Sequence, residues 1–231
     1  MDLPETKTTS MQQRGTARLD MLTRTAADMF LAGGYDALSI DALIERVGGS
    51  RRNVYEHFGG KEQLFIEAVG QRCIELGEPI AALKLDDAEV PARQALQKFG
   101  RTLLDVVLSP EVLALHRLMV AEGHRFPDLA AKAWRSGHNS AAQILGRWVA
   151  RQQQTGRLEP SGDPFRLADQ FISMVIADAQ LRRLVSMPVS ALETKAILNA
   201  AVETFLHGRI AGHRVRKPLA AGTKKQPKGR A

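Results

Sequence analysis

Apolar residues recur along most of the chain at the three- and four-residue spacing of an amphipathic helix. Between Arg18 and Ala32 they fall at Leu19, Leu22, Ala26, Met29 and Phe30. Residues at this spacing share one face of a helix. A sustained alternation of apolar and polar residues, which would indicate a β-strand, does not appear. The pattern therefore predicts an all-α protein.

Glycine pairs divide the next part of the chain into short helices. Gly33-Gly34 stops the first helix, and Gly48-Gly49 separates a helix over Ile40–Val47 from one over Arg51–Phe58. Glycine interrupts helices because it readily adopts backbone conformations that other residues avoid. After a third glycine pair, a longer helix is expected from Lys61 to about Leu76.

Prolines mark the starts of most of the remaining helices. Proline is favoured in the first turn of a helix, where its missing N–H breaks no hydrogen bond. We expect five further helices over Pro91–Leu108, Pro110–Arg125, Pro127–Gln154, Pro164–Ser186 and Ser190–Ala211. The predicted architecture has about nine helices, in an N-terminal three-helix domain and a larger C-terminal helical domain.

The first three predicted helices have the form of a helix-turn-helix, whose second helix in the pair can enter the DNA major groove. Val54 and Phe58 are four residues apart and can anchor this helix to the core. Arg51, Arg52 and Asn53 then lie at its exposed leading end. Arginine suits guanine and asparagine suits adenine, and a good bidentate pair discriminates by about 1–3 kcal/mol. These three residues are therefore the candidate base readers.

Other polar side chains nearby suit the DNA backbone. Tyr55 and His57 can reach the flanking phosphates. Lys61 stands at the start of the following helix, where its ammonium group and the free backbone N–H groups can hold one phosphate together. Ser39 and Ser50, the predicted N-cap residues of the two short helices, complete the candidate DNA contacts.

The net charge of +7 indicates a polyanionic partner, but most of the sequence does not carry that charge. Residues 214–231 hold seven basic and no acidic side chains, whereas residues 1–65 have a net charge of −1 and residues 66–213 of +1. The tail is rich in Pro, Gly, Ala and Lys and is predicted to be disordered. It is either a non-specific phosphate-binding arm or a solvated tail that aids solubility.

DNA binding by a slightly acidic segment depends on where its charges lie. We expect the basic side chains to share one face, namely those of Arg14, Arg18, Arg51, Arg52 and Lys61. We expect four acidic side chains to point away from it, namely those of Asp20, Asp28, Asp36 and Glu45. Acidic groups scattered over the same face would weaken the interpretation.

The segment from Ile40 to Phe65 carries a motif that resembles a known family. The core of the motif is Tyr55-Glu56-His57-Phe58 followed by Lys61 and Leu64, and Gly34-Tyr35 upstream fits the same pattern. In these residues the chain is similar to the N-terminal domain of TetR/AcrR-type transcriptional regulators. It departs from their usual pattern in three places: Ile44 replaces a small residue, Gly49 a branched apolar residue and Asn53 a threonine.

The resemblance implies a role for the rest of the chain. Residues 66–213 would form a regulatory domain, and Leu115–Ala130 is similar to the AefR-like subgroup of C-terminal domains. The family implies a homodimer that binds a pseudo-palindromic operator in double-stranded DNA, and a repressor that an unidentified small-molecule effector releases. A dimer also follows from the short recognition helix, because one such helix reads only a few base pairs.

The last two predicted helices are the candidates for an isologous four-helix interface between two copies. The residues expected in the dimer interface are Ala168, Phe171, Ile172, Val175, Ala179, Leu198, Val202 and Phe205. The alternative is that they face the core of a single copy.

An effector pocket is expected to be mostly apolar with a few oriented polar groups. Residues that interrupt apolar helix faces with polar or aromatic groups are therefore the candidates. They are His116, Met119, Trp134, His138, Phe171 and Met174. Each of them could also be an ordinary core or surface residue, and the sequence does not name the effector.

Motifs for catalysis and metal binding do not occur in the sequence. The six histidines lack the spacing of a helical metal site, no nucleophile elbow or phosphate-binding glycine loop appears, and Cys73 is the single cysteine. We therefore predict no catalytic residue, no metal site, no cofactor and no enzymatic activity. Because no apolar run of about 20 residues and no signal-peptide core is present, we expect a cytoplasmic protein without membrane contact.

These observations divide the chain into four expected segments: a flexible arm over 1–13, the helix-turn-helix domain over 14–62, the effector and dimerisation domain over 63–213, and the basic tail over 214–231. Two alternatives remain open. The first is a helical small-molecule-binding protein without sequence-specific DNA recognition. The second is an effector-independent DNA-binding factor, which the absence of an enclosed cavity would favour.

Overall fold

The computed structural model describes residues 6–85 and 90–208, and their side chains from Thr16 onward. Within these residues the chain is helical and contains no β-strand. The elements are α1 (Thr6–Gly33), α2 (Ile40–Val47), α3 (Arg51–Phe58), α4 (Lys61–Ala81), α5 (Ala92–Val107), α6 (Pro110–Glu122), α7 (Pro127–Trp134), the π-helical turn η1 (Arg135–Asn139), α8 (Ser140–Gln154), α9 (Pro164–Leu184) and α10 (Ala191–His207). The predicted all-α class is confirmed.

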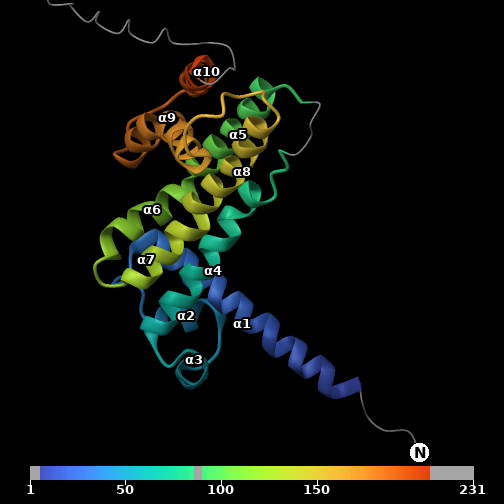
Figure 1. Cartoon of the computed structure of the whole chain (residues 1–231). Coiled ribbons are helices and arrows are strands. Elements are labelled where there is room, and N and C mark those ends of the chain that lie inside the picture. The colour runs from blue at the N-terminus through green and yellow to red at the C-terminus, as the bar shows by residue number, and fades with distance from the viewer. Residues whose placement is uncertain (1–5, 86–89, 209–231) are drawn as a thin grey trace, which may run out of the picture.

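The helix-turn-helix lies at one end of the molecule and the pair α9–α10 at the other, with α4, α6 and α8 running between them (Figure 1). The nine predicted helices correspond to the described ones if α7, η1 and α8 count as one interrupted helix. The predicted helix over Pro127–Gln154 is thus continuous in direction, but one π-helical turn breaks its regular hydrogen bonding.

Two helix boundaries differ most from the sequence prediction. Helix α1 begins at Thr6, so residues 6–13 are helical rather than a flexible arm, and its first turns extend away from the body (Figure 1). Helix α4 continues through Gly77 and Pro79 to Ala81, past its expected end. A Cβ at Gly77 would lie 3.1 Å from the carbonyl oxygen of Ser136. The glycine therefore serves a close helix–helix approach rather than a helix end. The basic tail over 214–231 lies outside the described residues.

Side-chain caps and glycines form the helix-turn-helix as the sequence predicts. The Ser39 hydroxyl accepts a hydrogen bond from the Ala42 N–H (3.1 Å), and the Ser50 hydroxyl accepts one from the Asn53 N–H (3.3 Å). Gly48 has a φ of 72°, which favours glycine over any residue with a side chain. The turn between α2 and α3 is therefore set locally, before tertiary packing is considered.

The larger core belongs to the C-terminal domain and joins α5, α8, α9 and α10. Close helix packing depends on small residues: a Cβ at Gly100 of α5 would lie 2.3 Å from Leu198 Cδ1 of α10, and one at Gly146 of α8 would lie 2.4 Å from Phe165 Cδ1 of α9. Substitution of either glycine would therefore force the facing helix to move.

The eight residues predicted to form the dimer interface lie inside this core, which corrects that prediction. Between 0% and 5% of the surface of each is exposed within a single copy. They are Ala168, Phe171, Ile172, Val175, Ala179, Leu198, Val202 and Phe205. Helical periodicity identified the apolar faces of α9 and α10 correctly. Those faces pack against α5 and α8 of the same chain rather than against a second copy.

The smaller core crosses the expected domain boundary at residue 62. It contains Leu43, Val54 and Phe58 of the helix-turn-helix, but also Leu118 of α6, and Phe126 and Leu129 at and after the α6–α7 turn. Four rings meet where the two parts join, with the Phe65 centroid 4.6 Å from Phe126 and 5.0 Å from Tyr35. The core of the DNA-binding head is thus completed by helices of the C-terminal domain.

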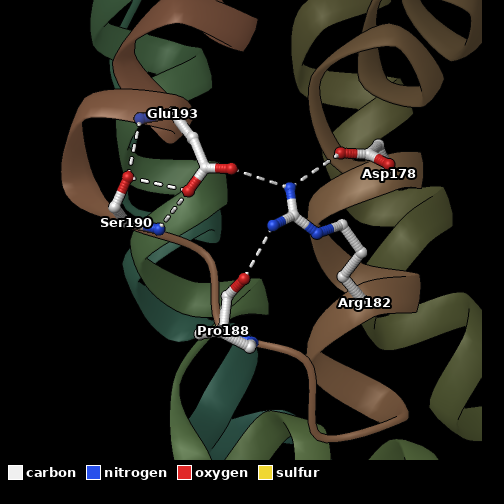
Figure 2. A network of polar contacts seen from close by, with 5 residues as sticks. All are labelled: Asp178, Arg182, Pro188, Ser190 and Glu193. Atoms are coloured by element: carbon white, nitrogen blue, oxygen red, sulfur yellow. Dashed lines mark hydrogen bonds and ion pairs between the residues drawn. The ribbon is translucent and has the colours of Figure 1, made fainter.

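A polar network fixes the turn between α9 and α10 (Figure 2). Ser190 and Glu193 form a reciprocal capping box at the start of α10. Arg182 of α9 donates to the Glu193 carboxylate (3.0 Å) and to the Pro188 carbonyl (2.8 Å), and forms an ion pair with Asp178 (3.6 Å). The network holds the last two helices at a defined angle to each other.

Candidate nucleic-acid interface

Helix α3 presents one polar face to solvent because only two of its residues point inward. Val54 and Phe58 are buried, with 1% and 6% of their surface exposed. The side chains of Arg51, Arg52, Asn53, Tyr55, Glu56 and His57 are exposed. The four-residue spacing that predicted this anchoring therefore matches the observed burial. The six exposed side chains define the recognition face of α3.

The leading end of α3 is held by its own cap. Ser50 donates from its hydroxyl to Asn53 Oδ1 (3.1 Å) and accepts from the Asn53 N–H. The Asn53 amide nitrogen remains exposed and can donate to a base. Ser39 accepts a hydrogen bond from the Ala42 N–H at the start of α2. The helix caps formed by Ser39 and Ser50 are confirmed, and a direct contact of either serine with DNA stays a prediction.

The two arginines of the recognition face are paired with carboxylates. Arg51 donates two hydrogen bonds to Asp41 of α2, and these bonds lower the pKa of Asp41 and raise the pKa of Arg51. Arg52 donates to Glu56 one turn along α3 (2.6 Å). Exposed ion pairs contribute little net stability. Each arginine can therefore exchange its carboxylate for a base edge or a phosphate at small cost.

The expected separation of basic and acidic side chains is only partly present. Asp28 lies away from α3 and pairs with Arg72 (3.6 Å). The Asp36 backbone carbonyl accepts a hydrogen bond from Lys61 Nζ (3.4 Å), whereas its carboxylate pairs with Arg125 of the α6–α7 turn (3.2 Å). Asp41 and Glu56, which the sequence prediction did not consider, lie on the recognition side. The face is a mosaic of both charges rather than a uniformly basic surface, so charge placement weakens the DNA-binding interpretation, which rests instead on the sequence motif and the exposed side chains of α3.

Lys61 stands at the free N-terminus of α4. No side chain caps this helix, since Gly60 occupies the N-cap position. The Lys61 ammonium lies 4.5 Å from the centroid of the Tyr35 ring, which directs it along the surface. Uncapped N–H groups and a directed ammonium group together suit one DNA phosphate.

Two further groups flank the recognition face. About half of the Tyr55 surface is exposed, and the His57 side chain is also exposed, next to the Phe58 ring. Arg18 of α1 was expected near this surface, and its guanidinium lies 3.3 Å from the position that a Cβ at Gly48 would take. Arg18 therefore reaches the turn that separates α2 from α3.

A cavity of about 300 Å³ lies in the C-terminal domain, between α4, α5, α6, α7, η1, α8 and α9. Of the six predicted effector residues, it brings together His116, Met119, Trp134 and His138. The other two lie elsewhere. Phe171 is buried against Phe99 and Phe205, and Met174 is exposed on the opposite side of α9. The chain thus gathers four of the six residues around one cavity.

Sequence reasoning missed the contribution of α4 to this cavity and chose two residues of α9 that do not line it. Helix α4 supplies Cys73, Leu76, Gly77 and Ile80, and α9 supplies Gln180 among other residues. Gly77 carried a usable signal, because a glycine inside an apolar helix often marks a close approach. Gln180 carried none, since a single amide on a helix usually faces solvent.

Cys73 is buried, and burial raises the pKa of its thiol to about 11. Among the described residues there is no group of three or more His, Cys, Asp or Glu side chains that could hold a metal ion. Within the same part of the chain, no helix is both long and apolar enough to cross a membrane.

Known proteins resemble both parts of this arrangement. A family model described as bacterial regulatory proteins of the tetR family matches residues 22–68, and one described as the C-terminal domain of AefR-like transcriptional repressors matches residues 82–208. The HTH-type transcriptional regulator TcmR of Streptomyces glaucescens is 28% identical over 161 residues, which cover 65% of this chain and 70% of TcmR.

Solved structures share the fold over most of the chain. A TetR-family transcriptional regulator from Mesorhizobium loti superposes with a TM-score of 0.77 at 25% identity, covering 85% of this chain and 98% of its own. The flavonoid-responsive regulator FrrA superposes with a TM-score of 0.72 at 25% identity, covering 85% and 99%. The chain therefore belongs to the TetR family of DNA-binding transcriptional regulators, with an AefR-like C-terminal domain.

Proposed function

We propose that the chain acts in the cytoplasm as a homodimeric repressor that leaves its operator when a small molecule binds in the cavity of the C-terminal domain. The observation that carries this proposal is that the cavity and the DNA-binding head share helix α4. Cys73, Leu76, Gly77 and Ile80 line the cavity from α4, and Lys61 at the other end of the same helix faces the predicted phosphate.

A second connection runs through the α6–α7 turn. Met119 of α6 and Trp134 of α7 line the cavity, and the turn between these helices ends in Arg125 and Phe126. The Arg125 guanidinium lies 4.1 Å from the centroid of the Tyr35 ring and forms an ion pair with Asp36 (3.2 Å). A ligand that moves α6 or α7 therefore displaces the head as well.

A ligand shifts the protein between two states only by as much as its affinities for them differ. In this repressor one state would have the two recognition helices at the spacing of the operator half-sites, and the other would not. A coupling of about 1–3 kcal/mol between effector and operator is typical. It corresponds to a change of about 5- to 150-fold in operator affinity.

The surface we propose for the dimer is the outer side of α9 and α10, opposite to the buried residues first expected. Exposed small and apolar residues gather there: Ser173, Met174, Ala177 and Leu181 on α9, and Leu192, Ala196, Ala200 and Thr204 on α10. A shallow groove between the two helices is lined by Ser173, Met174 and Thr204, among others. The proposed four-helix interface is therefore still formed by α9 and α10, but by their exposed faces rather than by their buried ones.

Two observations weigh against the alternatives. The cavity favours an effector-responsive protein over an effector-independent DNA-binding factor. The fully exposed polar face of α3, with Lys61 beside it, favours DNA recognition over a protein that only binds small molecules. FrrA, which has a similar fold, is described as flavonoid-responsive, and this supports a small organic effector here.

Selection of bound DNA from a random pool tests the proposal. We expect a pseudo-palindrome whose half-sites are centred about 10 base pairs, or a multiple of that, apart. Binding to the selected site should weaken steeply with salt, because Lys and Arg displace counterions from phosphates. Enrichment of no common sequence would exclude the sequence-specific repressor, and an asymmetric site would exclude the symmetric dimer.

A further inference from the structure

We propose that the cavity binds a neutral aromatic molecule of one or two rings that carries a hydroxyl group. This inference rests on the proposed function, in which the cavity is the effector site. It adds the chemical class of the effector, and it is carried by the charge, shape and polar groups of the cavity wall.

Among the described residues, the wall contains no Asp, Glu, Lys or Arg side chain, and its histidine His138 is paired with Asp169. All of the described residues that line the cavity are apolar, glycine, histidine or glutamine. A carboxylate or an ammonium group would lose its hydration there without gaining an opposite charge, which is strongly unfavourable. His116 does not supply that charge, because burial lowers its pKa and favours the neutral imidazole.

A flat aromatic surface stands at the opening of the cavity. The rings of Trp134 and His138 are stacked, with centroids 4.2 Å apart and an angle of 19° between their planes. Trp134 is 60% exposed although it lines the cavity, so it stands between the interior and solvent. His138 is held from outside by Asp169 (3.2 Å), which fixes the orientation of its ring. An aromatic ligand can stack on this surface, whereas an aliphatic one gains only contact area.

A pair of polar side chains interrupts the apolar wall on α6 and α9. Gln180 Nε2 lies 3.4 Å from His116 Nδ1. This separation is long for a hydrogen bond, and both groups can still donate and accept. A hydroxyl group also does both, and it can therefore bridge the amide and the imidazole. A ligand without such a group would leave this pair incompletely bonded.

The size of the cavity limits the ligand further. About 300 Å³ is at the lower end of the ~300–1,000 Å³ range of small-molecule sites. Aliphatic side chains such as Leu103, Val107 and Ile176 form much of the remaining wall. The cavity therefore fits a compact ring system with one polar end better than a long or branched molecule.

A matched set of three probes tests each part of the inference on the full chain by titration calorimetry. The probes are 2-naphthol, 2-naphthoate, which replaces the hydroxyl by a charge, and decahydro-2-naphthol, which removes the aromatic rings. We expect 2-naphthol to bind at least about tenfold more tightly than 2-naphthoate. We expect decahydro-2-naphthol to bind about three- to tenfold more weakly than 2-naphthol.

Three variants assign the binding to the cavity. Trp134→Leu should weaken 2-naphthol and leave decahydro-2-naphthol unchanged, and Gln180→Leu should weaken 2-naphthol but not unsubstituted naphthalene. Gln94→Leu, at an exposed glutamine of α5 outside the cavity, should change neither affinity.

The inference is overturned if 2-naphthoate or decahydro-2-naphthol binds as tightly as 2-naphthol, if 2-naphthol does not bind, or if Trp134→Leu and Gln180→Leu leave its affinity unchanged. Operator binding measured on the same samples separates this result from the proposed function. If 2-naphthoate binds more weakly to Trp134→Leu than to the wild type and releases the operator, the result would contradict the ligand class and support the repressor. If 2-naphthol binds in the cavity without any effect on operator binding, the result would support the ligand class and contradict the proposed repressor function.

Discussion

At the scale of single residues, the recognition face combines the candidate base readers with acidic neighbours that form ion pairs with two of them. Asn53 has an exposed amide, whereas Arg51 and Arg52 are bound to Asp41 and Glu56. Lys61 is directed by Tyr35 and stands apart from the base readers. The arrangement is consistent with two separate predicted roles, sequence reading by α3 and phosphate binding at the start of α4.

Substitution of Asn53 and of Lys61 should distinguish these roles. Asn53→Ala is expected to reduce the ratio of operator to random-DNA affinity by about 5- to 150-fold, because it removes one base contact. Lys61→Ala should weaken binding to both DNAs alike and reduce the salt dependence by about one counterion. Both are measured by fluorescence anisotropy at several salt concentrations. An equal loss on both DNAs for Asn53→Ala would remove its base-reading role.

The Asp41 carboxylate should limit DNA affinity by competing for Arg51. Asp41→Asn removes one negative charge from the recognition side, so binding to all DNA sequences is expected to tighten about two- to fivefold at low salt. The same anisotropy titration measures this change, with Asp20→Asn on α1 as the control for net charge. Weaker operator binding by Asp41→Asn would instead mean that Asp41 positions Arg51 for the base.

Sequence alone predicted which residues of α3 are exposed, because burial of Val54 and Phe58 follows from their spacing on one helix. It did not predict the partner of Arg51, since Asp41 lies on a different helix and meets it only after the turn at Gly48 forms. Local periodicity therefore determines the direction of a side chain, and tertiary structure determines its partner.

At the scale of elements, the helices whose ends were predicted correctly are those with local stop signals. Helices α2 and α3 end at glycines with positive φ. Helix α4 passes Gly77 and Pro79 because Gly77 packs against the η1 backbone and Pro79 lies in the last turn. A helix end is thus hardest to predict from sequence where packing between helices determines how far the helix continues.

The turn between α9 and α10 should be sensitive to acid. Hydrogen bonds from the Ser190 N–H, then from its hydroxyl and from Arg182, lower the pKa of Glu193 from 4.5 to about 2. Because the folded pKa is below the ordinary value, the stabilisation is present above pH 4.5 and is lost as the pH falls toward 2. Figure 2 shows Ser190 and Arg182, which lose the charged Glu193 carboxylate as their partner when it is protonated.

Glu193→Gln tests this dependence, since glutamine keeps the capping box and cannot be ionised. We expect a lower melting temperature than wild type above pH 4.5, and a difference that narrows as the pH falls toward 2. Asp178→Asn changes the other carboxylate beside Arg182 and serves as the matched control. If the difference in melting temperature between wild type and Glu193→Gln stays constant from pH 4.5 to about 2, Glu193 acts only as a helix cap.

At the scale of the whole molecule, the residues first predicted for the dimer interface are buried, and the interface that we propose lies on the opposite faces of α9 and α10. Apolar periodicity identifies the more hydrophobic face of a helix, and in these two helices that face fills the core of a single copy. The outer face contains smaller residues and a few large ones such as Met174, so it has a weaker apolar signal. The apolar face of a helix can therefore be predicted more readily than whether that face packs in the core or against a second copy.

A charge on the outer face of α9 should separate the dimer. Met174→Arg is expected to give a monomer in sedimentation velocity and to weaken operator binding at least about tenfold, because the second half-site no longer contributes. Gln94→Arg adds the same charge on α5 and should leave the dimer intact. An intact dimer in Met174→Arg would place the interface elsewhere.

The core shared between the head and the C-terminal domain limits how such regulators can be recombined. A hybrid that joins residues 1–62 to a foreign sensor domain loses Phe65 of α4, and Leu118, Phe126 and Leu129, which cover the apolar surface of the head. We expect that hybrid to aggregate or to melt at lower temperature. A hybrid that also carries α4 and the α6–α7 corner should fold. The smallest DNA-binding part that can be transferred is therefore made of segments that are not continuous in the sequence.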